Sequence, residues 1–169
     1  MTKEKQIIEV IRVAGGKFVG RTRLQKTCYL LSLIGDFKGF NFGYYHYGPY
    51  SEDLTETLEI ACAFGGITEK VERTNWGALY SIYNVDDKAL QENSISKNGS
   101  GLIEKAKSSD SVILELAATA AYFATQQNKD PWKETSDCKP EKSDNGRLEQ
   151  AKALYAELRN IAPELPAIS

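Results

Sequence analysis

Residues 110–127 form the segment that most restricts how this chain can fold. Apolar side chains occupy nearly every position around the circumference of a helix drawn through this segment. They are Val112, Ile113, Leu114, Leu116, Ala117, Ala120, Tyr122 and Phe123. A helix that is apolar all round is normally buried. We therefore expect it to form the centre of a domain and to be covered by other helices.

Amphipathic segments on both sides of this stretch can supply the covering helices. Their apolar residues recur every three or four positions, which is the spacing of one helix face. The helices predicted in this way cover residues 3–14, 21–34, 101–107 and 145–161. A third helix of the front half is predicted to begin after Ser51, a typical N-cap residue, because Glu52 and Asp53 follow it where the helix dipole favours anions.

Two polar segments are less regular. Residues 86–101 are expected to form an ordered loop or a short helix. Residues 128–142, which contain Pro131 and Pro140, are predicted to form a polar loop. The sequence leaves open whether that loop is ordered or folds only on binding.

A β-hairpin is predicted after the third helix. Residues 67–73 and 79–85 are rich in β-forming side chains, and residues 74–77 read as the turn between them. The resulting order (helix, helix, strand, helix, hairpin) is that of a winged helix. We expect a mainly α fold with a small β-hairpin, in which a winged-helix-like half (residues 1–86) packs on C-terminal helices (residues 87–169). The length of 169 residues fits one domain.

The segment 41–50 is unusually aromatic. It is predicted to form a short strand that leads into a turn at Gly48 and Pro49. On a strand, Tyr44 and His46 share one face while Tyr45 and Tyr47 share the other. One face must pack on the core, and the other is either structural as well or a recognition patch. Both interpretations stay open.

Charge is unevenly distributed, although the net charge is only −2. Residues 1–30 carry seven basic and two acidic side chains, whereas residues 51–66 carry four acidic and no basic ones. The recognition helix of a winged helix would be the acidic third helix, which repels phosphates. The basic residues of the second helix then have two interpretations: contact with nucleic acid, or a solvated face that pairs with the acidic helix. We favour the second.

No catalytic or metal-binding pattern is recognisable. His46 is the only histidine, and the capping role of Ser51 already accounts for that residue. Cys28, Cys62 and Cys138 are widely spaced and odd in number, which argues against a disulfide framework. We therefore expect a protein that is not an enzyme and has no catalytic residues, metal site or cofactor.

The chain is expected to be cytoplasmic, without a membrane partner. Its first residues are charged and polar rather than arranged as a signal peptide. The most apolar stretch, residues 112–124, is interrupted by Glu115 and is too short to span a bilayer.

Two motifs resemble those of bacterial families. The first is Val19-Gly20-Arg21-Thr22-Arg23-Leu24-Gln25-Lys26 followed by Tyr29-Leu30-Leu31, and the second is Tyr47-Gly48-Pro49-Tyr50-Ser51-Glu52-Asp53-Leu54. In this order they resemble the YwgA-like proteins and, more remotely, the Panacea (SocA-like) antitoxin domain. The resemblance implies a mostly helical domain. The similarity to Panacea also implies neutralisation of a toxin through protein–protein contact.

The sequence thus favours a non-catalytic protein-binding or regulatory module, with an antitoxin-like or defence-associated role as its narrower form. A winged-helix nucleic-acid-binding transcription regulator is the alternative. The expected partner is a protein such as a toxin, with nucleic acid as second choice and a homodimer as a further option. The predicted partner-binding residues are Arg21, Arg23, Lys26, Tyr44, Tyr45, His46, Tyr47 and Tyr50.

Overall fold

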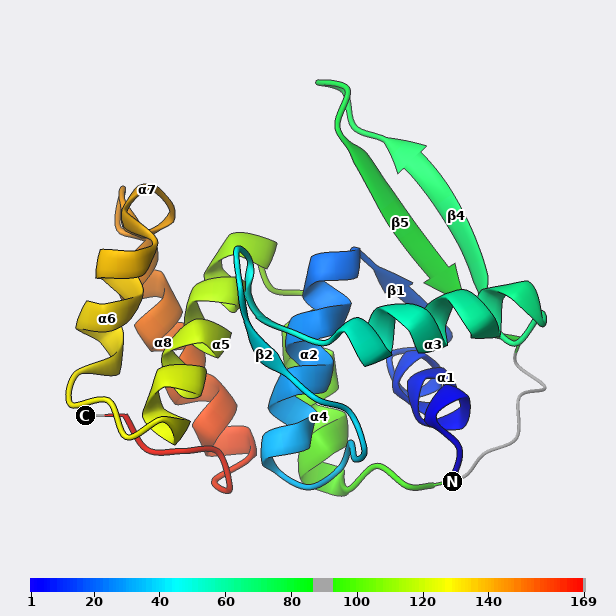
Figure 1. Cartoon of the computed structure of the whole chain (residues 1–169), viewed down its shortest axis with the longest axis horizontal. Helices are drawn as coiled ribbons and strands as arrows, with labels where there is room; N and C mark the ends of the chain where they lie inside the picture. The colour runs from blue at the N-terminus through cyan, green and yellow to red at the C-terminus, as the bar shows by residue number, and fades with distance from the viewer. Residues whose placement is uncertain (87–92, 169) are drawn as a thin grey trace.

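The structure, a computed structural model, describes residues 1–86 and 93–168 (Figure 1). The described residues are mainly helical, as the sequence predicts, and they include two small antiparallel sheets where the sequence predicts a single small β-hairpin. In chain order the elements are α1 (Lys3–Val13), β1 (Lys17–Val19), α2 (Arg21–Leu33), β2 (Gly43–Tyr45), β3 (Gly48–Tyr50), α3 (Glu52–Ala63), β4 (Thr68–Arg73), β5 (Leu79–Asn84), α4 (Lys97–Lys107), α5 (Ser111–Thr125), α6 (Pro131–Cys138), α7 (Pro140–Ser143) and α8 (Arg147–Ile161).

Helix α5 lies at the centre, as its apolar circumference predicts. It packs against α2, α6, α8 and strand β3. All of its residues from Leu114 to Ala121 are buried. Asp110 caps the start of the helix, because its carboxylate accepts hydrogen bonds from the backbone N–H groups of Val112 and Ile113. This N-cap satisfies two of the four amides that the first turn of a helix leaves unpaired.

The other predicted helices are present, with small differences at their ends. Ser51 caps α3, because its hydroxyl accepts a hydrogen bond from the N–H of Leu54. Helix α4 begins at Lys97 rather than at residue 101, and the hydroxyl of Ser96 caps it. The prediction for residues 86–101 falls partly on residues 87–92, which lie outside the described residues. None of the helices in the described ranges combines the length and the apolar character that a membrane span requires.

The predicted hairpin is formed by β4 and β5, and it projects beyond the helices (Figure 1). The sequence analysis missed β1, a three-residue strand that pairs with β5 and gives the sheet order β1-β5-β4. The buried side chains of Phe18 and Tyr83 lie opposite each other in this pairing. The base of the hairpin therefore belongs to the core, while its far end extends into solvent.

Residues 128–142 do not form a polar loop, so this prediction is wrong. They contain α6 and α7, and both prolines lie in the first turn of a helix. A proline is favoured there because its missing N–H would have no partner in the helix and its fixed φ suits the first turn. Asp130 caps α6, and Trp132 is buried beneath it.

The aromatic segment is also arranged differently from the prediction. It is a tight two-stranded hairpin, in which β2 pairs with β3 and the chain reverses at His46 and Tyr47. Gly48 and Pro49 belong to β3 rather than to the turn. The prediction failed because the continuous aromatic run has strand propensity throughout, and the turn lies in front of the glycine and proline that usually mark one.

Replacing Asp110 by alanine should destabilise the central helix. The change removes the acceptor for two backbone amides, so the free energy of unfolding should fall by about 0.5–2 kcal/mol. Chemical denaturation measures this loss. Asp137→Ala is the matched control, because Asp137 is an exposed carboxylate paired with the exposed Lys133. Equal destabilisation by the two substitutions would contradict the role of the cap.

Candidate functional site

The two strands β2 and β3, with the turn between them, form what we call the aromatic hairpin (residues 43–50). Tyr44, Tyr45, His46 and Tyr47 are exposed on it, with Tyr47 the most exposed of its tyrosines at 59%. Gly48 and Pro49 are buried, so one strand faces solvent while the other lies against the helices. Four of the predicted site residues are thereby brought together at one surface, and Tyr50 lies half-buried at its base.

Gln25 of α2 holds the end of the aromatic hairpin through the backbone. Its amide nitrogen donates to the carbonyl of Ser51 at 2.9 Å, and its amide oxygen accepts from the N–H of Ser51, also at 2.9 Å. The side chain therefore forms the same pair of hydrogen bonds that a neighbouring strand would form. Gln25 is buried, so both bonds are shielded from water.

Lys26 follows Gln25 and is fully buried, with 0% of its surface exposed. Its ammonium donates a hydrogen bond to the carbonyl of Pro49 at 2.7 Å. Burial lowers the pKa of Lys26 to about 7; Glu115 raises this pKa, and the charges of Lys139 and Lys142 lower it further. The prediction that Lys26 belongs to a basic face open to a partner is therefore wrong, because β3 and α5 cover this side of α2.

A second buried lysine holds the turn of the aromatic hairpin. The ammonium of Lys139, between α6 and α7, donates to the carbonyl of His46 at 2.8 Å and lies 3.2 Å from the carboxylate of Glu115. Lys142 donates to the same carboxylate at 2.7 Å and lies 4.5 Å from the centre of the Tyr47 ring. Glu115, the acid that interrupts the apolar helix, is thus the buried counter-ion of two lysines.

The sequence analysis did not identify Gln25, Glu115, Lys139 or Lys142 as parts of this site. One signal was present: a single carboxylate in the middle of an apolar helix must find a cation or be protonated. Its partners could not be named because they lie in the segment that was predicted to be a loop.

One residue of the exposed strand β2 also contacts the end of α5. The ring of Tyr44 stacks on Tyr122 and contacts Phe123, with 5.3 Å between the ring centres of Tyr44 and Phe123. Burial, with a contribution from Cys138, raises the pKa of the Tyr44 hydroxyl to about 12. A cavity of about 520 Å³ lies beside it and is lined by Tyr44, Tyr45, His46, Cys138 and Lys139.

Arg21 and Arg23 lie elsewhere, at the start of α2 beneath the β4–β5 hairpin. Arg21 donates to the carboxylate of Glu69 at 3.1 Å and to the hydroxyl of Tyr83 at 3.2 Å. Arg23 donates to the backbone carbonyls of Ser109 and Val19. The predicted pairing of these arginines with the acidic third helix is therefore wrong, because nearer acceptors on the sheet and the backbone take their place.

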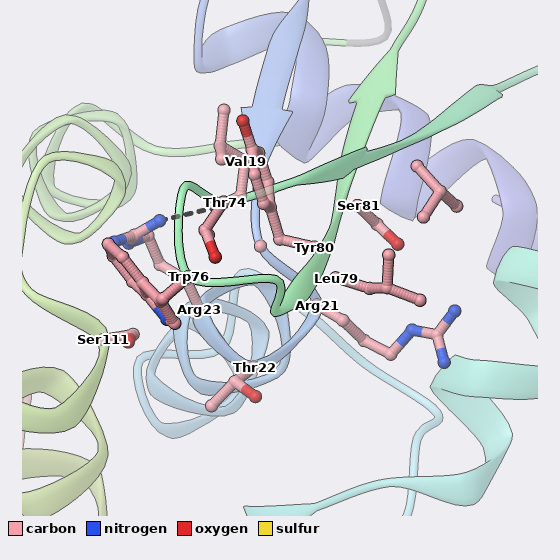
Figure 2. A pocket seen from close by; sticks show the side chains of 12 residues that line it. Val19, Arg21, Thr22, Arg23, Thr74, Trp76, Leu79, Tyr80, Ser81 and Ser111 are labelled. Atoms are coloured by element: carbon pink, nitrogen blue, oxygen red, sulfur yellow. Dashed lines mark hydrogen bonds between the residues drawn. The ribbon is translucent and has the colours of Figure 1, made fainter.

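Both arginines line a groove of about 750 Å³ under the β4–β5 hairpin. Figure 2 shows Arg21 extending to one side of this hairpin and Arg23 to the other, the side on which Trp76 lies. The two arginines thus line one cavity, while Tyr44 and Tyr45 line another. The predicted partner-binding residues therefore do not lie on one surface.

The described residues offer little for covalent or metal chemistry. Burial raises the pKa of the thiols of Cys28, Cys62 and Cys138, which keeps each further from the reactive thiolate form. Across residues 1–86 and 93–168, no three His, Cys, Asp or Glu side chains gather where they could hold a metal ion. What the site does present is a fixed aromatic surface above a buried cluster of charges.

The class of protein that these observations define is a mainly helical module that carries a clamped aromatic hairpin. Over nearly its whole length the chain is similar to the uncharacterized protein YwgA of Bacillus subtilis (strain 168). The two are 26% identical over 165 residues, which cover 95% of this chain and 99% of that protein. No family model matches the chain, and no solved structure matches it.

The buried ammonium of Lys26 should make the stability of the protein depend on pH. Its pKa is about 7 in the folded state and 10.5 as a free side chain, so between these values the unfolded chain binds more protons. The free energy of unfolding should therefore rise with pH above 7, by on the order of 1 kcal/mol per pH unit from this group. The Lys26→Met variant should lack this rise.

Denaturant unfolding of both proteins between pH 7 and 8.5 tests this expectation. The range stops there because the buried thiol of Cys28 and the tyrosines, whose pKa values are raised, lower stability at higher pH. The difference between wild type and variant should widen steadily across the range. A constant difference would mean that Lys26 does not change its charge there.

Gly48 should tolerate no side chain, because the aromatic hairpin approaches α5 closely at this residue. Its φ is +82°, and an added Cβ would lie 2.5 Å from the hydroxyl oxygen of Thr119. Gly35 is a matched control with a φ of +85° and open space around it. Alanine at either position adds backbone strain, but Gly48→Ala should lower the free energy of unfolding by about 1–3 kcal/mol more. Equal losses in denaturant unfolding would contradict the close approach.

Proposed function

We propose that this chain is a non-catalytic protein-binding module, and that its partner docks on the aromatic hairpin. The observation that carries the proposal is the combination of exposed tyrosine rings with a backbone fixed by buried side chains. Tyr44, Tyr45 and Tyr47 present large amphipathic surfaces to solvent. Tyrosine is enriched in protein interfaces, particularly among the residues that dominate binding energy.

The rigidity of the aromatic hairpin supports this use. An isolated two-stranded hairpin is only marginally stable in water. Here the side chains of Gln25, Lys26 and Lys139 hold the backbone of Ser51, Pro49 and His46. A surface that is already ordered loses little conformational entropy when a partner binds, so more of the contact energy appears as affinity.

This surface also carries a positive charge beside its aromatic rings. Lys142 is partly exposed beside the ring of Tyr47 and is paired with the buried Glu115. A partner with carboxylates beside an apolar patch would fit the tyrosine rings and the lysine together. Such a partner would be a protein rather than a nucleic acid, since the surface offers few free cations for a phosphate backbone.

A toxin is the narrower form of the proposed partner. The support for it is the resemblance of the helix motif ending in Gln25-Lys26 and of the Tyr47-Gly48-Pro49 segment to the Panacea antitoxin domain, and to YwgA-like proteins. On this proposal the chain is a cytoplasmic member of the YwgA-like group that neutralises or regulates a protein by contact. Rescue of growth when the chain is expressed with a toxic neighbouring gene product would support it.

A winged-helix regulator that binds nucleic acid is the second candidate. The order of α1, β1, α2 and α3 before the β4–β5 hairpin, with sheet order β1-β5-β4, favours it. Against it, α3 would be the recognition helix, and its exposed side chains include Glu52, Glu56 and Glu59. Duplex binding that appears at low salt and falls steeply with added salt would favour this candidate. The absence of binding at low salt would remove it.

Loss of the exposed tyrosine rings should abolish partner binding without unfolding the protein. Capture from the native host should be compared for the tagged wild type, the double variant Tyr45→Ser/Tyr47→Ser, and Trp76→Ser as a control. Trp76 is an exposed ring on the other hairpin, and it is more accessible than either tyrosine. A partner should bind the wild type and the control, and its measured affinity for the tyrosine variant should fall at least about tenfold. Equal binding by all three proteins, or no protein enriched by the wild type, would overturn the proposal.

A further inference from the structure

A second surface lies on the projecting β4–β5 hairpin, away from the aromatic hairpin. The strand register places Glu69, Val71 and Arg73 on one face of the hairpin, opposite Tyr83, Ser81 and Leu79. Arg21 contacts this face at its base through Glu69 and Tyr83. Val71 and Leu79, further out, are exposed to solvent. We call this side of β4 and β5, with Arg21, the hairpin face.

The hairpin face is apolar and carries a positive charge. Arg21 and Arg73 supply two cations, and Glu69, which is paired with Arg21, is its one carboxylate among the residues just named. The adjoining groove has both Arg21 and Arg23 in its lining, and its described lining includes no Asp or Glu. An occupant of this face should therefore combine apolar side chains with carboxylates.

Helix α3 exposes a surface of this kind. Its exposed residues include Glu52, Glu56 and Glu59, followed by Ile60 and, just after the last turn, Phe64. Phe64 is 87% exposed and is the most exposed large apolar side chain among the described residues. An aromatic ring so open to water gains by association. We call this side of the helix the α3 face.

The end of α3 lies close to the base of the β4–β5 hairpin. Cys62 of α3 lies close enough to Arg21 and Glu69 to be influenced by their charges, and Glu59 of its own helix acts on it as well. The chain runs directly from the end of α3 into β4 (Figure 1). The C-terminal end of α3 therefore lies next to the base of the hairpin face.

We propose that the chain forms a two-fold symmetric dimer in which the α3 face of each protomer packs on the hairpin face of the other. A two-fold axis places each face of one protomer on the complementary face of its partner, so one geometry satisfies both contacts. Val71 and Leu79 then cover Ile60 and Phe64, and Arg21 and Arg73 lie near Glu56 and Glu59. This dimer uses a surface different from the one proposed for partner binding.

Sedimentation velocity on the full chain tests the dimer. The wild type should sediment as a concentration-dependent dimer at micromolar concentrations. Phe64→Ser and Leu79→Ser each remove an exposed side chain, so both variants should remain folded by circular dichroism. Each should raise the dimer dissociation constant at least about tenfold. Glu59→Lys should weaken the dimer in the same direction, because it places a cation near Arg21.

Mixing the two serine variants gives the sharpest test. In a mixed dimer, the intact α3 face of the Leu79→Ser protomer meets the intact hairpin face of the Phe64→Ser protomer. One complete contact is restored, so the mixture should associate more tightly than either variant alone and less tightly than the wild type. Association of the mixture no stronger than that of the separate variants would overturn the proposed pairing of faces.

The remaining outcomes separate this inference from the proposed function. Tyr47→Ser should leave the dimer unchanged, and Leu79→Ser should leave capture of a partner by the aromatic hairpin unchanged. A wild type that stays monomeric throughout the micromolar range overturns the proposed dimer but not the proposed binding of a partner by the aromatic hairpin. A dimer that survives all three substitutions on the two faces overturns the assignment of the surface.

Discussion

The carboxylate of Glu115 is the charge on which the position of the aromatic hairpin depends. It lies in the middle of α5 and is 2% exposed, so it cannot rely on water for solvation. Lys139, between α6 and α7, and Lys142 of α7 supply the counter-charge, and Lys26 lies close enough for Glu115 to raise its pKa. Removing one partner from a buried ion pair typically costs about 3–5 kcal/mol, because the other charge stays buried alone. Helices α2, α5, α6 and α7 are joined through this cluster.

This cluster contains more cations than carboxylates, and the backbone of the aromatic hairpin balances part of the difference. The ammonium of Lys26 has the carbonyl of Pro49, and that of Lys139 has the carbonyl of His46. A carbonyl dipole compensates an ammonium only partly, which agrees with the lowered pKa of Lys26. The hairpin is therefore a structural partner of the buried charges as well as the exposed surface above them.

Much of the fold could be predicted because it follows from local patterns. The periodicity of α1, α2 and α8, the apolar circumference of α5 and the serine that caps α3 are all encoded within a few residues. Where local rules compete, prediction failed: Pro131 and Pro140 were read as loop formers, although a proline also suits the first turn of a helix. The turn at His46 and Tyr47 was not predicted either, since neither residue is typical of turns.

The candidate site was harder to predict because its important contacts join distant segments. Lys26 lies in a helix whose sequence gives no sign that this lysine is buried. Its burial requires a carbonyl 23 residues further on and a carboxylate in α5. The separation of Arg21 and Arg23 from the tyrosines likewise depends on β1, a three-residue strand that pattern analysis missed. Sequence patterns identified the right residue types but could not show which of them meet.

The two motifs quoted from the sequence now have a shared physical meaning. Gln25 and Lys26 belong to the first motif, while Pro49 and Ser51 belong to the second. The side chain of Gln25 binds the backbone of Ser51, and that of Lys26 binds the carbonyl of Pro49. Either motif alone would leave a buried ammonium without an acceptor or a carbonyl without a donor, and both are costly. The pair is thus a device for fixing a hairpin on a helix, and Glu115 is its necessary third part. The rings of Tyr44 and Tyr47 lie beside the ammonium groups of Lys139 and Lys142, yet both rings also face solvent. Fixing the hairpin does not require this exposure, and the proposed binding of a partner rests on it.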